Sequence, residues 1–205
     1  MSSLTDEIFS QLAGPATRQI SQQLGTGHAQ TAGAIAAALP MILGAMGRNA
    51  GQPQGAEALL GALGRDHTGA GGIADILGAV LGGQQSTRQT DGQGQLGHIF
   101  GGKLPRAEAG LGQVTGLGND RAQKLMKILA PIVMGYLAKR MFGGGGQNGS
   151  AGALGEILGH EQRQVQAQGG LGGGLLGAVL DQDGDGQLGL GDLLKMGGSV
   201  LGGQR

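Results

Sequence analysis

The sequence contains no cysteine and no tryptophan, and its only aromatic residues are three phenylalanines and one tyrosine among 205 residues. Without cysteine the chain forms no disulfide and has no thiolate nucleophile or sulfur-ligated zinc. With so few rings it is also poorly suited to stacking nucleic-acid bases. Its 14 basic and 14 acidic residues cancel, so it lacks the positive charge that displaces counterions from nucleic acid. We therefore expect no nucleic-acid partner.

Targeting signals and membrane-spanning runs are lacking as well. The opening residues, MSSLTDEIFSQLAG, carry acids where a secretory signal carries lysine or arginine. The longest apolar stretch, residues 32–46, is interrupted by Pro40 and two glycines and is shorter than the roughly 20 residues that cross a bilayer. This stretch predicts a buried helix, and we expect a cytoplasmic protein. Export without a signal peptide stays an open alternative.

Patterns typical of enzymes are missing too. The four histidines are far apart in the sequence, and GHEQR at Gly159 lacks the second histidine of a zinc-binding helix. No G-x-S-x-G nucleophile motif occurs. The glycine run at residues 143–146 is not followed by the Lys-Ser or Lys-Thr pair of a phosphate-binding loop. We expect a protein that is not an enzyme.

Glycine is abundant, with 48 residues, yet 39% of the chain is apolar and grouped in runs. The apolar residues from Leu125 to Tyr136 recur at the three- and four-residue spacing of a helical face, as do those from Ile35 to Met46. No long segment alternates with the two-residue period of a strand. The sequence therefore predicts an all-α protein, a multi-helical bundle with glycine-rich connectors.

Five short stretches recur in the same order, 91 to 99 residues apart, which predicts a duplication. The pairs are EIFSQL with HIFGGKL, LGTGHAQ with LGNDRAQ, ALPMILGAM with LAPIVMGYL, ALLGALG with ALGEILG, and ILGAVL with LLGAVL. We predict a first repeat over residues 1–82, a linker over 83–95, a second repeat over 96–168 and a C-terminal segment over 169–205.

Each long apolar helix of the predicted repeats has a candidate N-cap and an interior proline. Thr26 and Asn119 are the expected caps, and Pro40 and Pro131 predict a kink or a break. Glycines at three- and four-residue spacing, such as Gly33 with Ala37 and Gly61 with Gly64, favour close helix packing in a bundle. A membrane-inserting glycine zipper is the alternative interpretation.

The stretch DQDGDGQLGLGD, residues 181–192, has the spacing of a calcium-binding loop. Such a loop needs oxygen ligands at positions 1, 3 and 5, a glycine at 6, a backbone carbonyl at 7 and a carboxylate at 12. The predicted ligands of a Ca²⁺ ion are Asp181, Asp183, Asp185, the carbonyl of Gln187, and Asp192. Because Asp192 is shorter than the usual glutamate, Mg²⁺ is a possible competitor. A solvated acidic turn is the alternative.

A second stretch, DGQGQLG at residues 91–97, is similar to DGDGQLG at residues 183–189. In the equivalent loop Gln89, Gln93 and Phe100 would occupy positions 1, 5 and 12, which leaves one carboxylate of four. We expect no metal there and interpret the stretch as a decayed or incomplete twin.

Charge is uneven in one region only. Residues 103–140 contain seven basic and two acidic residues, a net charge of +5, and Arg121, Lys124 and Lys127 follow one another at three-residue spacing. A solvated helix face and a surface for an anionic partner or a membrane are both compatible with this stripe.

Two resemblances add to these expectations. The acidic loop resembles an EF-hand, and its terminal Asp192 is similar to the dockerin-type variant. The repeated LGxxxAQ motif, the proline-containing apolar helix and the ending LLGAVLDQDGDGQ resemble YidB-like bacterial proteins, a family of unknown function. This resemblance implies an all-α bacterial protein and transfers no catalytic residue.

We expect a non-enzymatic structural or interaction protein that binds calcium and that has a protein partner or self-associates. A membrane-active or exported protein with glycine-zipper helices is the alternative.

Overall fold

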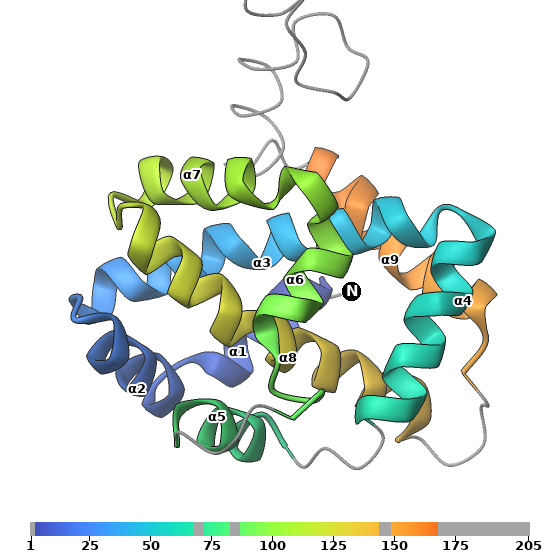
Figure 1. Cartoon of the computed structure of the whole chain (residues 1–205), viewed down its shortest axis with the longest axis horizontal. Helices are drawn as coiled ribbons and strands as arrows, with labels where there is room; N and C mark the ends of the chain where they lie inside the picture. Colours follow the sequence, from blue (N-terminus) through green and yellow to red (C-terminus); the bar gives the residue numbers. More distant parts are fainter. Residues whose placement is uncertain (1–2, 68–71, 83–86, 144–148, 168–205) are drawn as a thin grey trace, which may run out of the picture. The chain divides into compact units, whose positions relative to one another are not determined.

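The computed structural model describes residues 3–67, 72–82, 87–143 and 149–167 (Figure 1). Residues 1–163 form one compact unit, and residues 164–205 form a second unit that is described only as far as residue 167. All regular structure in the described residues is helical, which confirms the all-α class. The helices are α1 (Leu4–Leu12), α2 (Pro15–Leu24), α3 (His28–Ala50), α4 (Pro53–Ala62), the π-helical turn η1 (Leu63–His67), α5 (Ile73–Leu81), α6 (Gly92–Phe100), the 3-10 turn η2 (Gly101–Lys103), α7 (Leu104–Thr115), α8 (Asn119–Phe142) and α9 (Ala151–Ala167).

Helices α3 and α8 form the centre of the first unit (Figure 1). They pack against each other, and α8 also contacts α2, α5, α6, α7 and η1. The predicted apolar face of α3, from Ile35 to Met46, is buried as expected. Burial of α8 goes further than one face, because Met126, Met134 and Met141 are also buried. A helix that is covered on nearly all sides needs apolar residues all round.

Both long helices run unbroken through their interior prolines. Pro40 and Pro131 therefore do not split them, and the predicted break is wrong. A proline removes one backbone hydrogen bond. Packing of the neighbouring apolar turns, such as those of Leu39 and Ile132, holds each helix together across that loss, because both side chains are fully buried.

The predicted caps of the long helices are displaced. Helix α3 has Gly27 as its N-cap rather than Thr26, and α8 has Gly118 rather than Asn119. No side chain caps either helix. The preceding helices end at Gly25 and Gly116, with φ of 63° and 67°. Only glycine adopts this left-handed conformation readily, so the glycine-x-glycine turn, and not a capping side chain, determines where the next helix begins.

The helix order of α1, α2 and α3 recurs in α6, α7 and α8, and the turns give the register. Residues 91 apart occupy matching positions: Gly25 and Gly116, Gly27 and Gly118, Pro40 and Pro131, Gly44 and Gly135. This corrects the predicted pairing of LGTGHAQ with LGNDRAQ, which is 93 apart. Helix α6 begins at Gly92, inside the segment assigned to the linker. The predicted domain boundaries themselves stay a prediction.

Polar contacts join the two halves of the first unit. Glu161 of α9 is 2% exposed and accepts hydrogen bonds from the backbone N–H groups of Leu4, at 2.8 Å, and Thr5, at 2.9 Å. The Thr5 hydroxyl donates to the same carboxylate. A carboxylate at a helix N-terminus satisfies free N–H groups and complements the helix dipole. The start of α1 thus has two sets of acceptors: the local capping box of Ser3 and Asp6, and Glu161, which lies 156 positions from Thr5 in the sequence.

A second polar cluster holds α1 against α8. The Glu7 carboxylate accepts from the Tyr136 hydroxyl and from the Arg140 guanidinium, each at 2.5 Å. Burial and the hydrogen bond to Glu7 raise the pKa of Tyr136 above its ordinary value of 10.0, and the Arg140 guanidinium opposes this shift.

Glycine allows close helix contact at positions other than those expected. A Cβ on Gly33 would meet no atom within 4 Å, so its predicted packing role is wrong. At Gly47 a Cβ would lie 3.1 Å from the carbonyl oxygen of Leu158, because α9 crosses α3 there. A Cβ on Gly92 would overlap the carbonyl group of Lys127. Gly92 therefore allows α6 to lie directly on the backbone of α8.

Among the described helices, α3 alone is long and apolar enough to cross a membrane by length and composition. Of its most apolar 18-residue stretch, 61% is buried inside the protein. In this structure α3 is the core helix that the sequence predicts.

Candidate functional site

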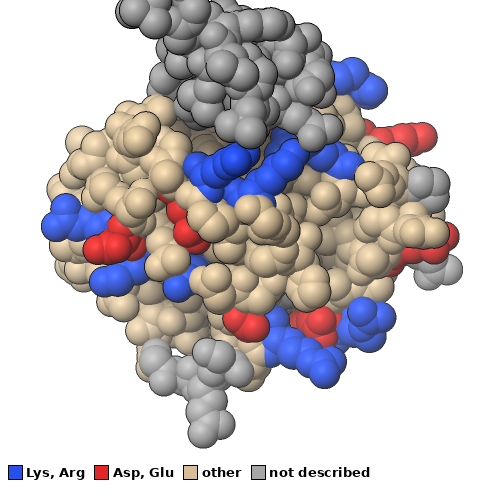
Figure 2. Space-filling view, turned by 45° about the horizontal axis from the view of Figure 1, so that its top comes forward, with Lys and Arg blue, Asp and Glu red and all other residues tan. Residues whose placement is uncertain are grey.

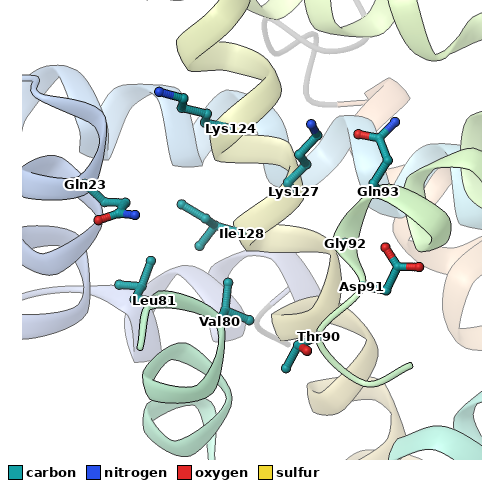
Figure 3. Close-up of a pocket in the computed structure, with 10 residues that line it drawn as sticks. All are labelled: Gln23, Val80, Leu81, Thr90, Asp91, Gly92, Gln93, Lys124, Lys127 and Ile128. Atoms are coloured by element: carbon teal, nitrogen blue, oxygen red, sulfur yellow. The ribbon is translucent and has the colours of Figure 1, made fainter. Parts of the chain in front are cut away.

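A cleft of about 340 Å³ opens between α2, α5, α6 and α8 (Figure 3). Its size is at the lower end of the range of small-ligand sites. The lining residues come from both halves of the duplicated sequence: Gln23, Val80, Leu81, Thr90, Asp91, Gly92, Gln93, Lys124, Lys127 and Ile128.

The apolar part of the cleft is formed by three aliphatic side chains. Val80 and Leu81, at the end of α5, point toward Ile128 of α8 (Figure 3). Val80 and Leu81 are half-buried, whereas Ile128 is buried. Gln23 reaches toward Ile128 from α2. These side chains offer a wall that an apolar ligand group can cover.

The basic part of the cleft is formed by two lysines of α8. Lys124 is exposed and Lys127 is half-buried. In Figure 3 the Lys124 side chain extends to the left of α8 and the Lys127 side chain extends upward to the right, beside Gln93. In the described part of the chain neither ammonium group has a hydrogen bond or ion pair. Arg121, the third residue of the predicted basic stripe, is exposed and does not line the cleft. The stripe is thus divided between a solvated residue and two cleft residues.

The first turn of α6 forms the opposite wall. Asp91 is the N-cap of α6, and its carboxylate accepts from the N–H of Gly94 at 2.9 Å. The following residue, Gly92, contacts the α8 backbone at Lys127, as described above, and so places Gln93 beside Lys127 (Figure 3). The predicted decayed calcium loop is therefore the start of a helix. Its single aspartate stabilises that helix.

Figure 2 shows Lys and Arg side chains at several places on the face it displays, with one group of them near its centre. Within the cleft, the two lysines stand against one carboxylate, that of Asp91. The Asp91 carboxylate accepts a backbone hydrogen bond, so two ammonium groups without a described partner stand against one carboxylate that is partly engaged.

The predicted calcium ligands Asp181, Asp183, Asp185, Gln187 and Asp192 all lie outside the described residues. Within the described ranges no group of three or more His, Cys, Asp or Glu side chains could hold a metal ion. The calcium site stays a prediction from the sequence.

Sequence reasoning missed the residues that complete the cleft around the lysines. Val80 and Leu81 belong to ILGAVL, which the sequence marks only as a repeated stretch. Gln93 belongs to the stretch interpreted as a decayed loop. The usable signal was the small distance in sequence between these two stretches, since a short connection keeps consecutive helices adjacent.

These features define an all-α protein with a duplicated helix order and a small, partly basic cleft. The chain belongs to DUF937, a family of bacterial proteins of unknown function, which matches residues 6–140. The match runs from α1 to α8 and so includes all helices that line the cleft. The narrower resemblance to YidB-like proteins stays a prediction. No curated protein and no solved structure matches the chain.

Proposed function

We propose that this chain is a non-enzymatic binding protein that holds a negatively charged partner in the cleft between α2, α5, α6 and α8. The observation that carries the proposal is the pair Lys124 and Lys127. These lysines have no partner among the described residues and stand beside an apolar wall. Charged groups that a fold does not pair internally are suited to binding a ligand or partner of opposite charge.

The chemistry of the lining supports binding more than catalysis. Apart from the lysines and Asp91, the side chains are amides, one hydroxyl and aliphatic groups. Specific binding sites combine an apolar wall with a few polar groups that orient the ligand. The cleft has this composition.

Photo-crosslinking in bacterial cells tests the proposal. A crosslinking side chain at Leu81, inside the cleft, should give a discrete adduct that disappears when Lys124 and Lys127 are both replaced by glutamine. The control position is Gln19, which is exposed on α2 and does not line the cleft. Equal adducts at both positions, or no adduct at Leu81, would contradict the proposal.

We further propose that Asp181, Asp183, Asp185, the Gln187 carbonyl and Asp192 bind one Ca²⁺ ion. The support is the spacing of these residues, with Gly186 at the position of the sharp turn. Four carboxylates at such short spacing repel one another, and a divalent cation removes that repulsion. A lone loop of this type is suited to a structural clip.

Titration calorimetry of calcium into chelator-treated protein tests the site. The wild-type chain should give a saturable heat, and a chain with Asp181→Ala and Asp185→Ala should give none. Magnesium, titrated in parallel, measures the competition. Equal calcium heats from both proteins would refute the assignment.

A membrane-active protein is the second candidate, because α3 is long and apolar enough to span a bilayer. Its burial opposes insertion, since α3 would have to leave the core that Leu39, Ile42 and Leu43 fill. Co-sedimentation with liposomes, with and without calcium, separates the two candidates. Absence of the protein from the lipid pellet under both conditions would remove the second.

A further inference from the structure

We propose that the cleft binds a single-chain anionic amphiphile, with a fatty acid as the ligand class. The carboxylate would lie at Lys124 and Lys127, and the alkyl chain would cover Val80, Leu81 and Ile128. This inference rests on the proposed binding role of the cleft and names the ligand.

The basic part and the apolar part of the cleft together favour a ligand that has both a negative charge and an alkyl chain. A small anion would use the ammonium groups but leave the aliphatic wall in water. A neutral hydrocarbon would cover the wall but leave the lysines without a counter-charge. A ligand with both parts gains apolar burial and charge-assisted hydrogen bonds. At about 340 Å³ the cleft matches a ligand with one chain better than a lipid with two.

The duplication shows that the fold does not require these lysines. The residues of α3 that match Lys124 and Lys127, 91 positions earlier, are Gly33 and Ala36, both exposed. The two helices share the proline at Pro40 and Pro131 and nevertheless differ here. Lysines that only kept a helix soluble would be equally useful on the exposed side of α3. Their presence on α8 alone therefore points to a ligand at the cleft.

The walls keep the lysines and the apolar residues in a defined arrangement. Because Gly92 has no Cβ, α6 lies directly on the α8 backbone at Lys127. The first carbon atoms of the Lys127 side chain therefore lie between the two helices. Gln93, beside Lys127, adds an amide donor on the same rim (Figure 3). Asp91 is the one acid at the cleft, and its contact with the Gly94 N–H directs its carboxylate to the α6 backbone.

Tryptophan reporters give a direct test, because the chain contains no tryptophan. With Leu81→Trp, addition of dodecanoate below its micelle concentration should shift the emission to the blue and saturate. The control is Val114→Trp on α7, where the native side chain is 40% exposed and the position matches Gln23 in the other half. Its emission should not change. Calorimetry on the unsubstituted protein provides the same affinity without a reporter.

Charge variants test the position of the carboxylate. The double variant Lys124→Gln and Lys127→Gln should bind dodecanoate about tenfold more weakly, as expected for the loss of two solvent-accessible ion pairs. The matched control, Lys103→Gln and Lys139→Gln, removes the same charge from two exposed positions outside the cleft. It should bind as the wild type does. Circular dichroism establishes that both variants are folded.

Dodecanol and acetate separate the two parts of the ligand. Each should bind at least tenfold more weakly than dodecanoate, because each engages one half of the cleft. Dodecanol binding equal to that of dodecanoate, equal loss in both double variants, or no dodecanoate binding would overturn the proposal. A discrete protein adduct at Leu81, together with no dodecanoate binding, would leave the cleft as a binding site and refute only the ligand class.

Discussion

The two halves of the first unit use the same helix order for different purposes. In α3 and α8 the positions 91 apart agree where the chain turns or packs, as at Pro40 and Pro131. They differ at the surface, where α3 has Gly33 and Ala36 and α8 has Lys124 and Lys127. The shared positions are those that the fold requires. The differing positions are free to carry function, and here they place charge beside the cleft.

A second comparison concerns two nearly identical stretches. DGQGQLG, residues 91–97, begins α6 with Asp91 as its N-cap. DGDGQLG, residues 183–189, is the predicted calcium loop and lies outside the described residues. The stretches differ only in having Gln93 or Asp185 at the third position. The same residues are thus used as a helix start in one copy and proposed as a metal ligand set in the other.

The largest expected effect is the loss of calcium binding when the second stretch is given the first one's residues. Replacing Asp181 and Asp185 by glutamine makes loop positions 1, 3 and 5 equal to Gln89, Asp91 and Gln93. Because half of the four carboxylates are removed, the calcium heat in titration calorimetry should disappear. The reverse change, Gln89→Asp with Gln93→Asp, should create no site, since Asp91 remains the cap of α6. A calcium heat retained by the first variant would contradict the prediction.

The next largest effect concerns the N-terminal caps of α1 and α6, the first helix of each half. Helix α1 has a local capping box, formed by Ser3 and Asp6, and its Leu4 and Thr5 N–H groups also donate to the distant Glu161. Helix α6 has the local cap alone, that of Asp91. Glu161→Ala leaves the N–H groups of Leu4 and Thr5 without their acceptor and should reduce the free energy of unfolding by about 3 kcal/mol. Thermal unfolding should show a decrease of roughly 10 °C in Tm.

The control for this prediction is Glu156→Ala, on the exposed side of the same helix α9. It removes the same charge and should change Tm by less than about 2 °C. Equal Tm values for the two variants would show that α9 does not cap α1.

A smaller effect is expected at the local cap. Asp91→Ala removes one hydrogen bond to the N–H of Gly94 and should cost about 1 kcal/mol of unfolding free energy. Asp120→Ala is the control, because Asp120 lies in the first turn of α8 but does not cap it. Chemical denaturation should rank the two variants in this order. The reverse ranking would argue against a capping role for Asp91.

Much of the fold was predictable from the sequence because its signals are local. The apolar periodicity from Ile35 to Met46 and from Leu125 to Tyr136 gave both central helices, and the repeated stretches gave the helix order. The helix starts were displaced, because Thr26 and Asn119 are good caps in isolation and the glycine turns override them. Burial of α8 on nearly all sides, and the capping of α1 by Glu161, depend on tertiary contacts that no local pattern records.

The candidate site was predictable only in part. The stripe with Lys124 and Lys127 was visible as an excess of charge, but its wall was not. Val80 and Leu81 reach Ile128 only after α5 has packed on α8. Gln93 joins them because Gly92 allows α6 to lie on the backbone of Lys127. Both contacts arise from packing between helices, so the cleft follows from the fold rather than from a motif.

The smallest effect concerns Tyr136, which stands where α3 has Ala45. It is the only tyrosine in the sequence, so a titration followed by absorbance reports the ionisation of this one phenol. Burial and the hydrogen bond to Glu7 raise the pKa of Tyr136, so the folded chain retains this proton above pH 10.0 better than the unfolded chain does. Its contribution to stability is therefore fully present below pH 10.0. As pH rises through the folded-state pKa, that contribution is lost.

Substitutions of the two partners should move this titration in opposite directions. Glu7→Gln removes a nearby negative charge and should lower the pKa of Tyr136, whereas Arg140→Gln removes a positive charge and should raise it. Glu156→Gln is the control, since Glu156 is exposed on α9 and is not among the groups that shift the pKa of Tyr136. It should leave the titration unchanged. A titration of Tyr136 at pH 10.0 that neither substitution moves would show that this cluster does not join α1 to α8 in solution.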